Sequence, residues 1–209
     1  MPGRSLLRTS SLYKTLLVCF LLVPFCAAHD WKYEEEHSAS REFAAGGTVR
    51  VHMKVGDLHI RSGAADKIQL RYTVKSRRER NVKESRVDFD VRGSEATIEF
   101  QAPSTNNTEF EVELEVPANT HLDVHEKVGD VTVENVEGDK DLELGVGDIR
   151  IIKPSSAYRM VRASTGIGDV NADGYGETSG WLGKTLKYHG DGKYELRAHV
   201  GVGDITLER

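Results

Sequence analysis

The chain has 209 residues, a formal net charge of −5 and only two cysteines. This acidic balance disfavours nucleic acid and anionic lipid as main partners, because both would repel the surface. Cys19 and Cys26 both fall in an N-terminal segment that we expect to be cleaved, which excludes thiol catalysis and cysteine-ligated zinc from the mature protein.

Residues 1–28 have the organisation of a secretory signal peptide. Three basic residues precede an apolar run that ends at Phe25, and the small residues Cys26 to Ala28 supply a cleavage site before His29. The run is too short for a transmembrane helix, and a lipoprotein signal fits less well because the bulky Phe25 precedes the cysteine. We therefore expect an exported protein in the periplasm, at the cell surface or secreted, with no transmembrane segment after cleavage.

The mature chain is expected to hold one domain. Residues 29–41 contain an acidic run and few apolar residues, which predicts a mobile leader. From residue 42 to residue 209, apolar and polar residues alternate in runs such as Val49 to Val55 and Tyr194 to Val202. No segment keeps a helical period for three turns, so the sequence predicts an all-β domain over residues 42–209.

One six-residue pattern occurs five times: apolar, Gly, Asp, apolar, any residue, apolar. Its glycine and aspartate pairs are Gly56-Asp57, Gly129-Asp130, Gly147-Asp148, Gly168-Asp169 and Gly203-Asp204. Glycine reaches positive φ without a steric penalty, and aspartate can accept a hydrogen bond from the nearby backbone, so each pair predicts a tight structural turn. We expect the residues flanking a turn, such as Val55 and Leu58, to lie on the same face.

The spacing of these turns favours stacked coils. The aspartates at 130, 148 and 169 are 18 and 21 residues apart, and the other two intervals, 35 and 73 residues, are close to two and four times this period. A repeat near 20 residues predicts a β-solenoid or β-roll of short strands whose turns align along one edge. The alternative is a β-sandwich of hairpins, in which Gly-Asp is simply a common turn.

Two loops are candidates for contact with a ligand. Residues 75–86 carry many basic side chains, which indicates a solvated hairpin tip or, alternatively, a contact for an anionic surface or polysaccharide. In the glycine-rich segment 174–183, Tyr175 and Trp181 could stack on a sugar ring. Alternatively, Trp181 plugs the end of the core.

The sequence contains no motif that assigns catalysis, a metal or a cofactor, and we expect a protein that is not an enzyme. Histidines 121 and 125 would lie about 13 Å apart on one strand, too far for joint ligation. Stacked Gly-Asp turns could gather calcium, but they lack the glycine pairs and nine-residue period of calcium-binding β-rolls. A carbohydrate-active enzyme on a β-solenoid would need acids converging in a cleft and usually more coils.

With its signal peptide, repeated V-G-D-apolar-x-apolar units and closing segment 190–207, the chain resembles the exported bacterial β-strand-repeat proteins of unknown function named putative adhesins. The resemblance covers essentially the whole mature chain. It implies a β-solenoid at the cell envelope that binds or scaffolds an envelope or surface partner, either polysaccharide or protein, and it brings no catalytic residues. The alternative function is a small carbohydrate-binding or carbohydrate-active protein.

Overall fold

The computed structural model describes residues 31–152 and 158–208, and this part of the chain is all-β, as predicted. It contains fifteen strands, one short α-helix and one 3-10 turn. The strands are β1 (Tyr33–Glu42), β2 (Thr48–Ser62), β3 (Lys67–Ser76), β4 (Arg86–Arg92), β5 (Glu95–Gln101), β6 (Thr108–Val116), β7 (His121–Val128), β8 (Val131–Glu134), β9 (Lys140–Val146), β10 (Ile149–Ile152), β11 (Tyr158–Ile167), β12 (Val170–Ala172), β13 (Thr185–His189), β14 (Tyr194–Val202) and β15 (Ile205–Glu208). The helix is α1 (Glu79–Glu84) and the 3-10 turn is η1 (Thr105–Asn107). The predicted signal peptide, residues 1–28, lies outside the described residues.

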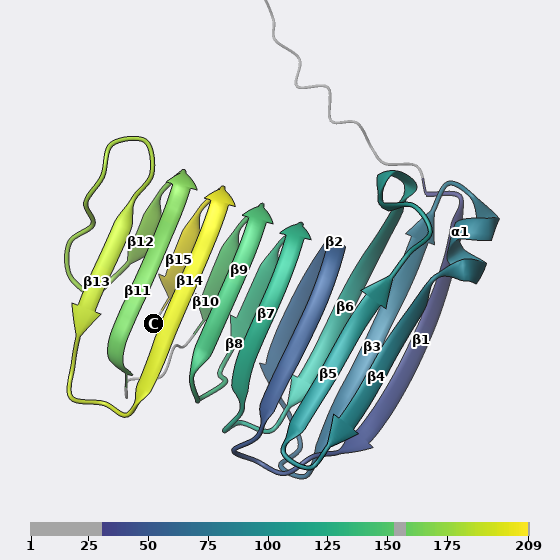
Figure 1. Cartoon of the computed structure of the whole chain (residues 1–209), viewed down its shortest axis with the longest axis horizontal. Coiled ribbons are helices and arrows are strands. Elements are labelled where there is room, and N and C mark those ends of the chain that lie inside the picture. Colours follow the sequence, from purple (N-terminus) through teal and green to yellow (C-terminus); the bar gives the residue numbers. More distant parts are fainter. Residues whose placement is uncertain (1–30, 153–157, 209) are drawn as a thin grey trace, which may run out of the picture.

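The long strand β2 joins all strands into one sheet that folds over itself in two layers (Figure 1). Its first half pairs with β5 and β7, and its second half, from Gly56, pairs with β6 and β8. We call the first layer B, with strand order β4-β5-β2-β7-β9-β14-β11-β13. The second, layer A, has the order β1-β3-β6-β2-β8-β10-β15-β12.

From β2 onward the stack is parallel in both layers, except that the last strand of layer B, β13, pairs with β11 antiparallel. Four Gly-Asp pairs each link a strand of layer B to one of layer A, giving the units β7–β8, β9–β10, β11–β12 and β14–β15, while the fifth, Gly56-Asp57, lies within β2 where that strand passes between the layers. Their order in space differs from their order in the chain, because β14–β15 lies between β9–β10 and β11–β12. After β12 the chain returns through β13 on the outer side of β11, and then enters the position between β9 and β11.

The N-terminal part of the fold is largely antiparallel, which the repeat did not predict. Strand β1 pairs with β3, β3 with β6, and β4 with β5, all antiparallel. The mobile leader expected over residues 29–41 is therefore wrong for its greater part, because residues 33–42 form the edge strand β1. Its side chains are almost all exposed, so the strand is held by backbone pairing over ten residues. For the same reason its sequence shows no alternation of apolar and polar residues.

The basic segment 75–86 is not the simple hairpin tip favoured from the sequence. It contains α1, whose Val82 side chain is buried while its charged residues form the ion pairs Arg80–Glu84 and Glu79–Lys83, 2.7 and 2.6 Å long. A helix of six residues is not stable alone, so burial of Val82 is what holds it in place.

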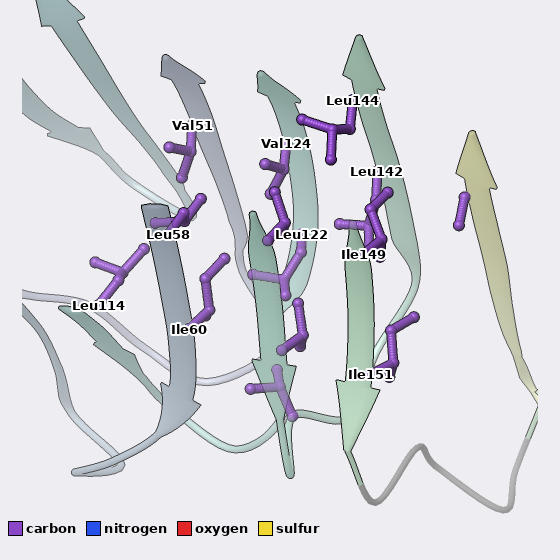
Figure 2. Packing of buried hydrophobic residues seen from close by; sticks show 14 of the residues in the cluster. Val51, Leu58, Ile60, Leu114, Leu122, Val124, Leu142, Leu144, Ile149 and Ile151 are labelled. Carbon is purple, nitrogen blue, oxygen red and sulfur yellow. The ribbon is translucent and has the colours of Figure 1, made fainter. Parts of the chain in front are cut away.

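The core fills the space between the two layers with aliphatic side chains from both (Figure 2). Val124 and Leu142 of layer B and Ile60 and Ile149 of layer A are each at most 1% exposed. In-register stacking brings like residues together, as in the series Leu58, Val131, Ile149, Ile205 and Val170 along layer A. Burying each such side chain contributes about 1.5–3 kcal/mol.

The corner glycines generate the first testable prediction. At Gly147 φ is +129°, and a Cβ would overlap the carbonyl oxygen of Gly129 on the neighbouring unit. We expect Gly147→Ala to lower the free energy of unfolding by about 2–5 kcal/mol, because backbone strain and steric overlap add. Denaturant unfolding of the variant measures this directly.

The matched control is Gly46→Ala. Gly46 also has a positive φ, +86°, but a Cβ there would have no neighbour within 4 Å. Strain alone should cost about 1–2 kcal/mol at this position. Equal losses for the two variants would contradict close backbone packing at the corner.

Candidate functional site

The five predicted Gly-Asp turns lie in one column along the corner between the layers. Their order in space is Gly56, Gly129, Gly147, Gly203 and Gly168, with φ between +129° and +153°. From Gly129 on, a Cβ at each glycine would overlap the carbonyl oxygen of the glycine in the preceding unit. Glycine is therefore required here both for its conformation and for the close approach of the backbones.

The aspartates of the same turns form a hydrogen-bonded ladder. Asp148 N donates to Asp130 Oδ1 at 2.9 Å, Asp204 N to Asp148 Oδ1 at 2.8 Å, and Asp169 N to Asp204 Oδ1 at 2.7 Å. At the other end, Asp130 N donates to Asp57 Oδ1 at 3.2 Å. The carboxylates of Asp57, Asp130, Asp148 and Asp204 thus each accept a bond from the next unit, which aligns neighbouring units. Among the residues described, no cluster of three or more histidine, cysteine or acidic side chains has the geometry of a metal site.

A row of exposed aliphatic side chains runs beside the glycine column. We call it the aliphatic row: Val128, Val146, Val202 and Ile167, adjacent in register on β7, β9, β14 and β11. Their exposed fractions are 45, 47, 45 and 55%. Leu182, 63% exposed, continues the row, since its carbonyl accepts a bond from Gly168 N at 3.3 Å.

This row corrects the expectation that the residues flanking each turn lie on the same face. The residues after the aspartate, such as Ile149, are buried, but those before the glycine, such as Val146, are exposed. Leu144, two residues earlier, is 2% exposed and already fills the inner side of the corner with Ile149.

The two aromatic residues singled out in segment 174–183 lie in different environments. Tyr175 is 3% exposed and packs edge-to-face on Tyr188, with ring centroids 5.2 Å apart. Trp181 is 90% exposed. Tyr175, and not Trp181, therefore closes the end of the core, and Trp181 is the aromatic side chain of this loop that solvent reaches.

Layer B carries a groove that the sequence did not reveal. It has a volume of about 1020 Å³ and crosses β5, β2, β7, β9 and β14, and we call it the layer B groove. The buried side chains of Met53, Phe100 and Leu144 lie beneath its floor, while Gly145 and Gly201 leave part of it without side chains. It opens where pairing of β2 with β5 ends, after His52 and Glu99.

A row of polar side chains lines this groove from strand to strand: Glu99, His52, His125, Glu143 and His199. The rings of His52 and His125 stack with centroids 5.3 Å apart, and His125 Nδ1 lies 3.0 Å from a Glu143 oxygen. Period-2 alternation places these residues on the outer face, so their outward orientation could be predicted from the sequence. What it lacked was the order of the strands.

Glu126 is a carboxyl group inside the core between Met53 and Leu144 of the neighbouring strands. It is 5% exposed, and neither carboxyl oxygen has a hydrogen-bond partner among the described residues. Burial, with smaller contributions from the negative charges of Asp57 and Asp130, raises the pKa of Glu126 to about 9. The group is therefore protonated at neutral pH. Its parity with Leu122 and Val124 was visible in the sequence and predicts this inward position.

One contact near the groove has the residue types of a nucleophilic pair. Ser164 Oγ lies 3.0 Å from His199 Nδ1 on the exposed surface of layer B. A serine nucleophile also needs a group that orients the histidine and donors for an oxyanion. Glu143, next to His199 across the strands, bonds to His125 instead, so among the described residues no third group orients His199.

Comparison with known proteins identifies the fold. No protein-family model and no curated protein matches the chain. The crystal structure of a putative cell adhesion protein from Clostridium sporogenes superimposes with a TM-score of 0.53 at 19% identity, covering 83% of this chain and 99% of that one. A putative adhesin from Bacteroides fragilis is more distant, with a TM-score of 0.37 and 10% identity over 83% and 97% of the chains. The first likeness shows a shared fold.

The buried carboxyl of Glu126 generates a prediction on pH dependence. Its pKa is higher in the folded protein than the ordinary 4.5, so between about 4.5 and 9 the folded state holds more protons than the unfolded state. Stability must therefore fall as pH rises through this window. We expect Glu126→Gln to remove this slope and to stabilise the protein near pH 9 by on the order of 5 kcal/mol.

Chemical denaturation at a series of pH values measures this effect as the difference between variant and wild type. Glu99→Gln, at an exposed carboxyl in the same groove, is the control and should leave the slope unchanged. Parallel pH profiles of wild type and Glu126→Gln would contradict the buried, unpaired state of Glu126.

Proposed function

We propose that this protein is a non-enzymatic, exported, adhesin-like protein that binds an envelope or surface partner through the outer face of layer B. In this proposal the parallel units from β2 to β12 act as a short β-solenoid, and the domain begins at Tyr33 rather than at residue 42. The shared fold with the Clostridium sporogenes protein, which is named for cell adhesion, supports it.

The observation that carries the proposal is the aliphatic row. A branched aliphatic side chain exposed by about half on each of four adjacent strands is a contiguous apolar strip rather than a scatter of single residues. Such strips on soluble proteins mark interaction sites, because a partner gains free energy by covering them.

The row is also rigid. Behind it, the backbones of neighbouring units are bonded through the glycine column, for example Gly147 N to Val202 O at 3.0 Å. The aspartate ladder fixes the same units on the other side of the turn. Binding to such a surface costs little conformational entropy, because β-branched side chains on a fixed strand already have few accessible rotamers.

Export rests on the predicted signal peptide in residues 1–28. Among the described residues, no helix is long and apolar enough to cross a membrane. We propose that the mature chain acts in the periplasm, at the cell surface or in the medium, on a polysaccharide or protein partner.

A second candidate function is carbohydrate binding through the loop that carries Trp181. The indole is 90% exposed, and an exposed indole is a common stacking platform for sugar rings. Tyr175 does not belong to such a platform, because its ring is buried against Tyr188.

The test uses the labelled mature chain and envelopes prepared from the producing cells. We expect the double variant Val146→Asp, Val202→Asp to bind these envelopes at least about tenfold more weakly, because two charges in the apolar strip would have to lose water on contact. Binding is measured by cosedimentation, and thermal unfolding verifies that the variant is folded.

Thr206→Asp is the matched control, since it adds a charge on a neighbouring strand at the outer face of layer A. It should bind like the wild type. Undiminished binding by the double variant, or no binding of the wild type to any envelope fraction, would refute the proposed function.

A further inference from the structure

The layer B groove has the dimensions of a site for a linear chain. It crosses five strands, from Glu99 on β5 to Gly201 on β14, and runs across their direction. At the usual strand spacing of about 4.8 Å this is a span of roughly 19 Å. An elongated ligand lying in it would meet the same kinds of surface on each successive strand.

The groove is close to electrically neutral. Its two lysines, Lys54 and Lys127, are matched by two exposed carboxylates, Glu99 and Glu143. Its third carboxyl group, Glu126, is neutral at ordinary pH because burial raises its pKa to about 9. A polyanion or polycation would find no excess of opposite charge here, which favours a neutral ligand.

The polar groups of the groove suit a ligand rich in hydroxyl groups. Imidazole, carboxylate, ammonium and amide groups, the last from Gln101, together offer both donors and acceptors along one line. The aliphatic stems of Lys54 and Lys127 and the half-buried Ala102 add apolar surface, and the bare backbone at Gly145 and Gly201 allows close approach. Sugar rings present both kinds of surface, hydroxyl groups at the rim and C–H groups on the faces.

An extended peptide fits this groove less well. Peptides that add to a sheet bond to the free backbone groups of an edge strand. Strands β7, β9 and β14 in the groove each have parallel partners on both sides. Their backbone groups are already used, so recognition must come from side chains.

We propose that the layer B groove binds a neutral linear polysaccharide, laid across the strands with His125 and Glu143 at its centre. The inference rests on the proposed function and names its ligand class. It also places the sugar on layer B rather than on the loop that carries Trp181.

The test is isothermal titration calorimetry of the mature chain with cello-, xylo- and manno-oligosaccharides of increasing length. We expect affinity for at least one series to rise with length until the chain spans the groove. His125→Ala should weaken that binding by about tenfold, the effect of losing a buried hydrogen bond. Gln101→Ala, a second groove variant, should weaken it as well.

His59→Ala is the matched control. His59 is as exposed as His125, with 42% of each side chain accessible, and it pairs with Glu134 at 3.7 Å on the outer face of layer A. This variant and Trp181→Ala should both bind like the wild type, and melting curves should show that all variants are folded.

Three outcomes would overturn the inference. The first is no binding of any neutral series while envelope binding persists, which would leave the proposed function standing with another ligand. The second is binding of the polyanion polygalacturonate alone. The third is loss of oligosaccharide binding with Trp181→Ala but not with the groove variants, which would move the site to the loop.

Discussion

Direct contact between glycine backbones at the corner of the sheet is the constraint on which the rest of the structure depends. At each corner from Gly129 to Gly168, the Cα of a glycine lies against the carbonyl group of the glycine in the preceding unit. Any side chain there would push the units apart, and the strands on both layers would lose their register together. The aspartate that follows adds a bond between units at the same height, so one dipeptide sets both spacing and alignment.

The surface that we propose for binding follows from that constraint. Because the glycine backbones lie close together at the corner, the side chain that precedes the glycine in each of four units is exposed to solvent. These four units are in register, so the exposed side chains form a continuous apolar strip. Glycines 145, 201 and 166 lie in the strand just before it, where a Cβ would come within 2.5 Å of a carbonyl oxygen on the neighbouring strand. The same close packing therefore exposes an apolar strip and leaves the adjacent groove partly bare. These glycines therefore serve both the packing of the strands and the shape of the proposed binding surface.

The sequence predicted the all-β class and the common conformation of the five turns, because both depend on local chemistry. It could not predict that β14–β15 lies between β9–β10 and β11–β12, since all these units carry equivalent apolar faces and pair equally well with one another. Strand β1 was missed for a different reason. It is fixed by backbone hydrogen bonds, and because almost all its side chains are exposed, its sequence has no apolar pattern from which a strand could be predicted.

The binding surface was even harder to predict from the sequence. His52, His125 and His199 are up to 147 residues apart in the chain and share a groove only because of strand order. Alternation correctly predicts that each faces outward, but it cannot say which neighbours face outward beside it. The exposure of Val146 contradicts alternation outright, since the rule assumes a straight strand and the chain bends one residue later.

The intercalated position of β14–β15 has a consequence for how the chain can fold as it leaves the ribosome or a membrane channel. Units β7–β8 and β9–β10 can dock as they emerge, but β11–β12 has only β13 as a partner, and no neighbour on the side facing β9–β10, until residues 194–208 are available. Until then an unpaired strand edge of β9 is open to mispairing, either with β11 of the same molecule or with a strand of another. Vectorial synthesis thus leaves this protein with a late step of insertion, rather than simple growth from one end.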